Sequence, residues 1–315
     1  MDDGHGDAVA EGDDAQAAVA EAGRRTTSRR ELSRQKGFEQ VSPEVGVLDA
    51  DAFDELLAED TDAALALLGA MTGATDETLR DLARRLAGRV LIDVARQGTA
   101  RRRGVGRLRR ARGDEPGDVD VDASLDAILT SRAGGGPLRA EDLAVTTWQR
   151  PDTALCLLVD RSGSMQGERL VAAAIAAAAA LYRHPADCSV VAFSDQAIVL
   201  TSQGESTATE RVIGDLLRLR GHGTTDLGLA LRVAHEQLSR SRAARRAAVL
   251  LSDCRVTAGG PAVVCAAALD ELAIICPADD RVDADALASA VGATCVGLAG
   301  PSDVPDALAA ALAPR

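Results

Sequence analysis

Aromatic residues are scarce in this chain of 315 residues, which has one Trp, one Tyr and three Phe. A core must therefore be built from Ala, Val and Leu, and no base-stacking surface of the kind used by single-strand nucleic-acid binders is evident. The charge balance is acidic, with 48 Asp and Glu against 35 Lys and Arg. Both features argue against a nucleic-acid-binding protein.

Lysine is almost missing as well, since Lys36 is the only one. The chain has no G-K-[ST] sequence, which excludes a Walker A ATPase. Its six cysteines form no C-x-x-C pair, so a zinc cluster is not expected. Cys156 and Cys188 lie in apolar runs, which predicts buried free thiols rather than disulfides.

Long apolar runs are also missing. The longest, from Leu170 to Tyr182, is too short and too rich in alanine to span a bilayer. The amino terminus, "MDDGHGDAVAEGDD", has neither the basic start nor the apolar segment of a secretory signal. We therefore expect no membrane span and a cytoplasmic protein.

The first half of the chain divides by composition. Residues 1–45 are rich in Asp, Glu, Gly, Ala and Arg without a sustained period, which predicts a mostly disordered acidic tail. Residues 46–150 contain apolar residues at helical spacing and predict a small helical region. Seven arginines lie in the strip Arg101–Arg112. A solvated linker or helix face is the preferred interpretation of this strip, and a docking site for an acidic partner or RNA is the alternative.

Residues 151–315 alternate between strand and helix patterns, which predicts an α/β fold with a doubly wound, mainly parallel sheet. Strands are expected at Ala154–Val159, Cys188–Phe193, Ala197–Leu200, Ala247–Leu251, Leu272–Cys276 and Thr294–Leu298. Most are continuous apolar runs, as expected for strands covered on both faces. The short gap between Phe193 and Ala197 suits a hairpin, so one edge strand is expected to be antiparallel.

Oxygen-bearing side chains follow the strands of this predicted sheet. The first strand is followed by Asp160, Ser162 and Ser164, the fourth by Asp253, and the glycine-rich "GHGTTDLGLAL" places Thr224 and Thr225 before a helix. Ligands of such sheets bind beyond the carboxyl ends of the strands. Two carboxylates with several hydroxyls make a hard oxygen site that suits Mg²⁺, or Mn²⁺, better than zinc or copper.

These three motif pieces, in this order, resemble the metal-ion-dependent adhesion site (MIDAS) of von Willebrand factor A (VWA) domains. The resemblance implies that Ser162, Ser164 and Thr225 ligate the metal and that Asp160 and Asp253 act directly or through water. Thr225 is preferred to Thr224 because "TDLG" aligns best with the family's glycine-threonine-aspartate loop. The chain departs from the family where Cys254 stands in place of a common glycine, and where the unusual "RVTAGGP" follows.

The segment "DVDASLDAILTSRAGGGPL" is similar to the one that precedes the A domain in CoxE-like VWA proteins. Together with the MIDAS resemblance, it implies a non-enzymatic adaptor whose Mg²⁺ captures an Asp or Glu of a protein partner. It also implies a MoxR-type AAA+ ATPase as partner, in protein maturation, metal insertion or chaperone-like remodelling.

A Mg²⁺-dependent hydrolase of the haloacid dehalogenase type is the competing interpretation. Such phosphatases need a second Asp where this chain has Ser162, and they need a lysine, for which only Lys36 is available. Two neighbours of the motifs have simpler interpretations. Asp226 is expected to cap the helix that follows it, and Arg161 is expected to be solvated.

Overall fold

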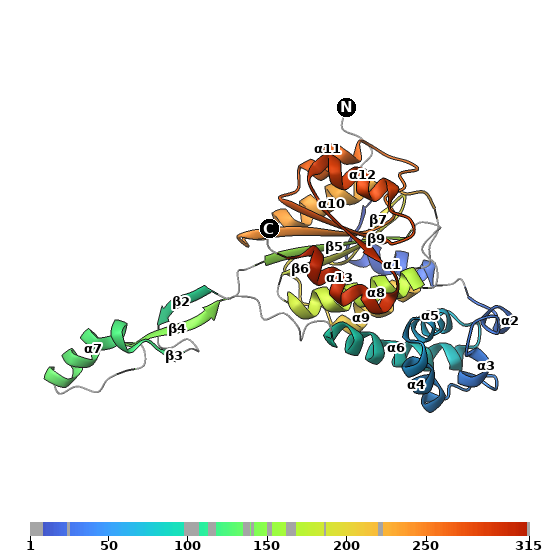
Figure 1. Ribbon diagram of the computed structural model, residues 1–315, viewed down its shortest axis with the longest axis horizontal. Helices are drawn as coiled ribbons and strands as arrows, with labels where there is room; N and C mark the ends of the chain where they lie inside the picture. Colours follow the sequence, from blue (N-terminus) through green and yellow to red (C-terminus); the bar gives the residue numbers. More distant parts are fainter. Residues whose placement is uncertain are drawn as a thin grey trace. The chain divides into compact units, whose positions relative to one another are not determined.

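The computed structural model describes most of the chain, in two compact units (Figure 1). The described residues are 9–23, 26–97, 107–112, 118–134, 139, 142–149, 153–161, 168–185, 187–219 and 223–313. One unit consists of Met1–Arg101 with Thr153–Arg315, and the other of Arg102–Asp152. The sequence suggests a boundary near residue 150 between a helical and an α/β region, whereas the structure joins the helices before residue 101 to the α/β region.

A seven-stranded sheet with the order β1-β7-β6-β5-β8-β9-β10 forms the centre of the first unit. Its strands are β1 (Val9–Ala10), β5 (Thr153–Asp160), β6 (Cys188–Phe193), β7 (Ala197–Thr201), β8 (Arg245–Leu251), β9 (Glu271–Pro277) and β10 (Thr294–Leu298). From β6 through β5, β8 and β9 to β10, all neighbours pair in parallel. The predicted doubly wound, mainly parallel α/β sheet is confirmed, and all the predicted strands are present.

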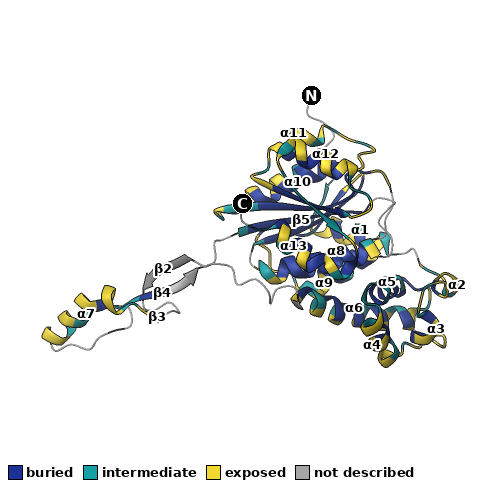
Figure 2. Ribbon diagram, in the orientation of Figure 1, coloured by how far each residue is buried: buried dark blue, intermediate teal, exposed yellow. Residues whose placement is uncertain are grey.

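Helices cover both faces of the sheet (Figure 1). Over one face lie α10 (Leu227–Ser239), α11 (Ala262–Ala267) and α12 (Val282–Val291), and over the other α8 (Glu168–Arg183), α9 (Thr209–Arg218), the short 3₁₀ helix η4 (Pro301–Asp303) and α13 (Val304–Ala311). Successive residues of a strand point to opposite faces, so Leu155 packs in one core and Cys156 in the other. Burial of both faces explains why the strands are apolar throughout (Figure 2).

The edge of the sheet differs from the expectation. The hairpin is present, because β7 pairs antiparallel with β6 and places Ala197 opposite Phe193. However, β7 is not the edge strand, since Val9 and Ala10 of β1 pair in parallel with Ala197 and Ile198. The amino-terminal segment therefore covers an edge that the sequence leaves open.

The predicted disorder of the first 45 residues is wrong for the part that the structure describes. Besides β1, this part forms α1 (Asp13–Ala22), α2 (Arg29–Leu32) and α3 (Phe38–Val41). Phe38 and Val41 are fully buried, and Ala15 and Val19 are almost fully buried. Their apolar residues form only short stretches, so no sustained periodic pattern shows in the sequence. α1 is buried against β7 and α9, which lie much later in the chain, and α3 packs on the helix at residues 50–59.

Glu11 ties this amino-terminal segment to the rest of the unit. Arg240 donates hydrogen bonds of 2.6 and 3.1 Å to its carboxylate, and Ser202 Oγ donates one of 2.6 Å. The hydrogen bond from Arg240 above all, helped by Ser202 and Gln237 and opposed by partial burial, lowers the pKa of Glu11 from 4.5 to about 2. The charged carboxylate therefore stabilises the fold.

Glu11→Gln is expected to lower the free energy of unfolding at neutral pH by about 1 kcal/mol, a value discounted for solvent screening because the side chain is 36% exposed. The folded pKa lies below the unfolded one, so the contribution is complete above about pH 4.5 and is lost as the pH falls toward 2. Urea unfolding of both proteins across this range measures it. A difference that does not shrink at low pH would contradict the role of the charge.

The three helices between residues 50 and 97 share a core with the sheet. They are α4 (Ala50–Glu59), α5 (Thr61–Met71) and α6 (Glu77–Gln97). Asp49 and Asp60 accept hydrogen bonds from the first free backbone N–H groups of α4 and α5, as helix caps do. Their buried residues belong to one hydrophobic cluster with Leu155 and Leu157 of β5. This continuous core explains why the helical segment and the α/β region form one compact unit.

Helix α8 lies at the centre of that core. Every residue from Leu170 to Leu181 is buried, because α8 packs on β5 and β6 and is also contacted by α5, α6, α9 and α13. Alanine favours helix formation, and its small side chain lets neighbouring elements come close. The alanine run therefore has a packing role, as a helix surrounded on all sides requires.

The second unit is an antiparallel sheet with one helix. Its strands, in the order β2-β4-β3, are β2 (Arg107–Arg112), β3 (Asp118–Val119) and β4 (Ala144–Gln149), and its helix is α7 (Val121–Gly134). The second half of the strip Arg101–Arg112 is thus a strand, and not the linker or helix face that the sequence suggests. The first half lies outside the described residues.

Two further expectations concern cysteines and membranes. All six cysteines are free thiols, as predicted, and four of them are buried. Within the part of the chain that the structure describes, none of the helices combines the length and apolar character needed to cross a membrane.

Candidate metal centre

Three loops of the first unit meet at the carboxyl edge of the parallel strands. β5 and β8 pair in parallel, so the loops that follow these two strands are neighbours. The first loop begins at Asp160, and the third begins with Ser252 and Asp253. The second loop follows α9 and ends at Thr225 before α10, and the next N–H, that of Asp226, donates a hydrogen bond of 2.8 Å to the Ser194 carbonyl just beyond β6, which brings this loop to the same edge. Three of the five predicted metal ligands therefore come to the same edge of the sheet. The other two, Ser162 and Ser164, lie outside the described residues.

Asp160 is held at the end of β5 with only 1% of its surface exposed. Ser252 Oγ donates a hydrogen bond of 2.6 Å to Asp160 Oδ2. The same Oγ accepts one of 2.9 Å from the backbone N–H of Cys254. Ser252 thus joins the first and third loops and fixes the Asp160 carboxylate. Ser252 is not among the residues predicted from the sequence, although a serine before an aspartate at a strand end is a visible signal.

Asp253 is the second buried carboxylate of the edge, with 5% exposed. Its Oδ1 accepts a hydrogen bond of 3.1 Å from the Arg255 N–H, and its Oδ2 lies 3.4 Å from Nη1 of Arg169 in α8. Arg169 therefore supplies positive charge near this carboxylate. Nothing in the sequence indicated the pair, because the two residues are 84 positions apart.

Thr225 joins the second and third loops. Its N–H donates a hydrogen bond of 2.8 Å to Thr257 Oγ1, and its carbonyl accepts bonds of 3.3 and 3.2 Å from the N–H groups of Thr257 and Ala258. Thr225 is 3% exposed, whereas Thr224 is an exposed residue. Of the two candidate threonines, Thr225 is therefore the one enclosed by the other loops.

The unusual "TAGGP" sequence allows the third loop to lie against the start of α10. Gly259 has φ +97°, and a Cβ at this position would lie 2.1 Å from Oδ1 of Asp226. That Oδ1 accepts a hydrogen bond of 2.8 Å from the Leu229 N–H and so caps α10, which confirms the predicted capping role of Asp226. Only glycine fits at position 259, because any side chain would displace the cap.

Cys254 occupies a backbone conformation that favours glycine. Its φ is +61°, and among the described residues no other non-glycine residue has a positive φ. The Cys254 N–H bond to Ser252 Oγ and burial of the thiol hold it there, and that burial raises the pKa of the thiol. The cysteine that departs from the family pattern therefore keeps the backbone shape that a glycine would give.

The Cys254→Gly variant is expected to have a free energy of unfolding about 1 kcal/mol higher than that of the Cys254→Ala variant. The reason is that alanine, unlike glycine, is strained in a left-handed backbone conformation. Both variants remove the buried thiol, so each is the other's control for lost packing. Thermal or urea unfolding of the two measures the difference. An alanine variant as stable as the glycine variant would show that the loop does not hold φ positive in solution.

Arg161 differs from the expectation of a solvated side chain, since only 4% of it is exposed. Its N–H donates a hydrogen bond of 2.7 Å to the Phe193 carbonyl, which continues the pairing of β5 with β6. Burial lowers the pKa of its guanidinium, and the Asp195 carboxylate acts in the opposite direction. The backbone of Arg161 thus continues the hydrogen bonding of β5 with β6 one residue beyond the end of β5, and this position encloses its side chain.

The donor chemistry of this edge is that of a hard-cation site. Asp160 and Asp253 supply buried carboxylates and Thr225 a buried hydroxyl. Within the described part of the chain, no three His, Cys, Asp or Glu side chains gather in a group that could hold a metal. A cation here would depend on hydroxyl ligands as well as the two carboxylates, and oxygen ligands of this kind suit Mg²⁺ or Mn²⁺.

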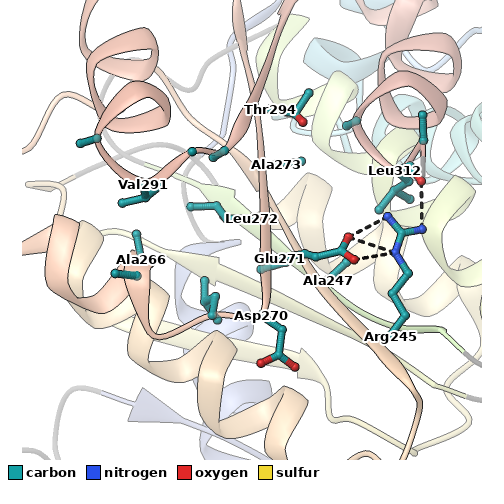
Figure 3. A pocket seen from close by; sticks show the side chains of 18 residues that line it. Arg245, Ala247, Ala266, Asp270, Glu271, Leu272, Ala273, Val291, Thr294 and Leu312 are labelled. Atoms are coloured by element: carbon teal, nitrogen blue, oxygen red, sulfur yellow. Dashed lines mark hydrogen bonds and ion pairs between the residues drawn. The ribbon is translucent and has the colours of Figure 1, made fainter. Parts of the chain in front are cut away.

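A cavity of about 340 Å³ lies at the opposite, amino-terminal edge of β8, β9 and β10 (Figure 3). Its wall contains Arg245, which bonds to the Glu271 carboxylate at 2.7 to 3.0 Å and donates to the Leu312 carbonyl at 3.0 Å. Asp270 pairs with Arg246 at 2.7 Å. These charged groups are bonded to one another, and their contacts connect β8 to β9 and to the end of α13.

The fold is that of a VWA domain, a class whose members are generally protein-interaction modules. The family model described as "VWA domain containing CoxE-like protein" matches residues 82–276. The match covers more than half of the chain, so the chain belongs to this family.

Several solved structures are also similar to part of this chain. One is a von Willebrand factor type A protein from Catenulispora acidiphila, with 18% identity, TM-score 0.41, and coverage of 52% of this chain and 43% of that one. Another is proximal thread matrix protein 1 of the mussel byssus, with 15% identity, TM-score 0.43, and coverage of 51% and 47%. BatB from Bacteroides thetaiotaomicron has 13% identity, TM-score 0.42, and coverage of 50% and 97%. The match to this chain spans less than half the length of the first two of these proteins. The comparison with curated proteins found no match.

Proposed function

We propose that this protein is a metal-dependent adaptor whose VWA domain captures an acidic residue of a partner protein. Asp160, Ser162, Ser164, Thr225 and Asp253 would hold Mg²⁺ or Mn²⁺, and an Asp or Glu of the partner would complete the coordination. The single observation that carries this proposal is the meeting of two buried carboxylates and a buried threonine at one edge of the sheet.

Charge and hydrogen bonding support a cation at this edge. Two buried carboxylates on adjacent loops repel each other, and a divalent ion between them would offset both that repulsion and the cost of burying them. Ser252 fixes one carboxylate and Arg169 lies beside the other. When bound, the ion would supply an electrophilic position for an outside carboxylate. These residues orient its ligands, as outer-shell partners do in metal sites.

The partner proposed is a MoxR-type AAA+ ATPase, a client of that ATPase, or both, in protein maturation, metal insertion or chaperone-like remodelling. Membership of the CoxE-like family supports this proposal. ATP-driven work would come from the partner, because the chain has no Walker A sequence. An adjacent gene for a MoxR-type ATPase would be the simplest supporting observation.

The competing Mg²⁺-dependent phosphatase has less support. The only lysine, Lys36, lies between α2 and α3, where its Nζ donates a hydrogen bond of 2.8 Å to Asp60. Figure 1 shows these helices beside α4 and α5, outside the sheet and its covering helices. A phosphatase would therefore need another cation in place of the lysine.

A four-part binding experiment tests the proposal. A purified candidate MoxR-type ATPase is bound to the wild type and to Asp160→Ala, each with Mg²⁺ and with EDTA. Capture is expected only by the wild type in Mg²⁺, because the other three conditions lack the bound ion. Equal capture in all four would overturn the adhesion mechanism. Phosphatase activity on generic substrates that disappears in Asp160→Ala would favour the enzyme instead.

A further inference from the structure

Helix α7 of the second unit packs with a polar side inward. Ser124 is its one buried residue among those the structure describes, at 1% exposed. Its Oγ donates to the Asp120 carbonyl at 2.7 Å and accepts a bond of 2.9 Å from the Ala144 N–H at the start of β4. These bonds fix which side of α7 faces its own sheet.

The apolar side of the same helix points outward. Val121, Leu125 and Leu129 are 60%, 49% and 55% exposed. At four-residue spacing they form one stripe about 80° wide along the helix. Figure 2 shows the helix exposed along most of its length. A helix normally buries such a stripe, so its exposure marks an interaction surface.

The second unit has little core of its own to account for these side chains. Among the residues of this unit whose burial the structure describes, Val145 is the one buried hydrophobic residue, and Val119, two residues before α7, is 49% exposed. These described side chains therefore leave the stripe exposed. A surface of this kind is completed by a groove on another molecule, as amphipathic helices are in helix-in-groove recognition.

Charge indicates what that groove carries. Asp122 and Asp126 are exposed on one flank of the stripe, and Arg132 lies near its end. In an antiparallel pair of α7 helices the same acidic flanks would face each other. Repulsion between these aspartates thus disfavours a second copy, their charge disfavours an anionic membrane, and both favour a groove edged with Lys or Arg.

We infer that α7 is a docking helix that inserts Val121, Leu125 and Leu129 into an apolar groove of a partner protein, with basic residues of that partner facing Asp122 and Asp126. The surface belongs to the second unit and uses no metal. It adds a binding site to the proposed carboxylate capture and does not depend on it.

The test starts with the full-length protein carrying a photo-cross-linking amino acid at Leu125 in the cells that produce it. A matched control carries the same group at Val282, an 81% exposed valine of the first unit. The protein captured at Leu125 is purified, and its Kd for the wild type is measured at low and high salt. The same measurement is made for three variants: Leu125→Glu, Asp122→Lys/Asp126→Lys and Val282→Glu. Circular dichroism checks that each variant is folded, which is expected because all four positions are exposed.

Leu125→Glu is expected to raise the Kd of the captured protein about tenfold or more at either salt concentration. The double charge reversal is expected to raise it about tenfold at low salt and less at high salt, because salt screens exposed charges. Val282→Glu should bind like the wild type. Two cross-linking results would overturn the inference: a Leu125 cross-link to a second copy, to the same chain or to lipid, and capture that does not exceed the Val282 control. Equal binding of all variants in the titration would overturn it as well.

Discussion

Asp160→Asn is expected to abolish the stabilisation of the protein by Mg²⁺ while leaving the chain folded. A cation that binds only the folded state adds about 2.7 kcal/mol to the free energy of unfolding at one hundred times its Kd. Asparagine has nearly the size of aspartate and can still accept the Ser252 Oγ bond of 2.6 Å. It lacks the charge, so this linkage energy should fall to near zero.

Urea unfolding with and without MgCl₂ measures this effect. Asp226→Asn is the matched control, because Asp226 lies on an adjacent loop and caps α10 rather than joining the proposed ligands. It should keep the full response to Mg²⁺ even though its own stability changes. A wild type that does not respond would contradict the metal site itself, and an Asp160→Asn variant that does respond would contradict the role of Asp160.

Ala176→Leu is expected to destabilise the protein by about 1–3 kcal/mol, the usual cost of inserting bulk into a packed core. Ala176 is fully buried in α8, a helix surrounded by the sheet and by four other helices. Leucine and alanine have similar helix propensities, so the loss would report packing alone. The change should weaken contact between the amino-terminal helices and the α/β region.

The matched control is Ala286→Leu, since Ala286 is an exposed alanine of helix α12. This variant is expected to remain within about 0.5 kcal/mol of the wild type. Thermal unfolding followed by circular dichroism measures both variants. Equal stabilities would mean that α8 has room on one side, and that the amino-terminal helices do not pack on it in solution as closely as they do in the structure.

The strands and helices of the α/β region could be predicted because each has a local cause. Apolar runs such as 154–159 and 272–276 are bounded by polar or turn residues, and the gap between Phe193 and Ala197 allows only a tight hairpin. Asp226 could be predicted as a cap because capping involves residues only three positions apart.

The side chains proposed to touch a metal remain a prediction from the sequence, and the structure brings three of them, Asp160, Thr225 and Asp253, to one edge of the sheet. What the sequence could not supply is the set of groups that hold them. Ser252 reaches Asp160 across 92 positions, Arg169 lies beside Asp253, and Thr257 meets Thr225 across 32 positions. Arg161 looked solvated because charged residues usually are, and only its place in the sheet register explains its burial.

The sequence by itself determined the order of strands and helices, the hairpin and the polar residues at the strand ends, because these depend on local pattern and spacing. The tertiary structure decided which residues those elements enclose. Pairing of Val9 and Ala10 with β7 orders a segment that looked disordered, and one continuous core joins helices α4–α6 to the sheet. The physical reason is that burial and hydrogen bonding across long stretches of chain depend on neighbours in space, which no local pattern records.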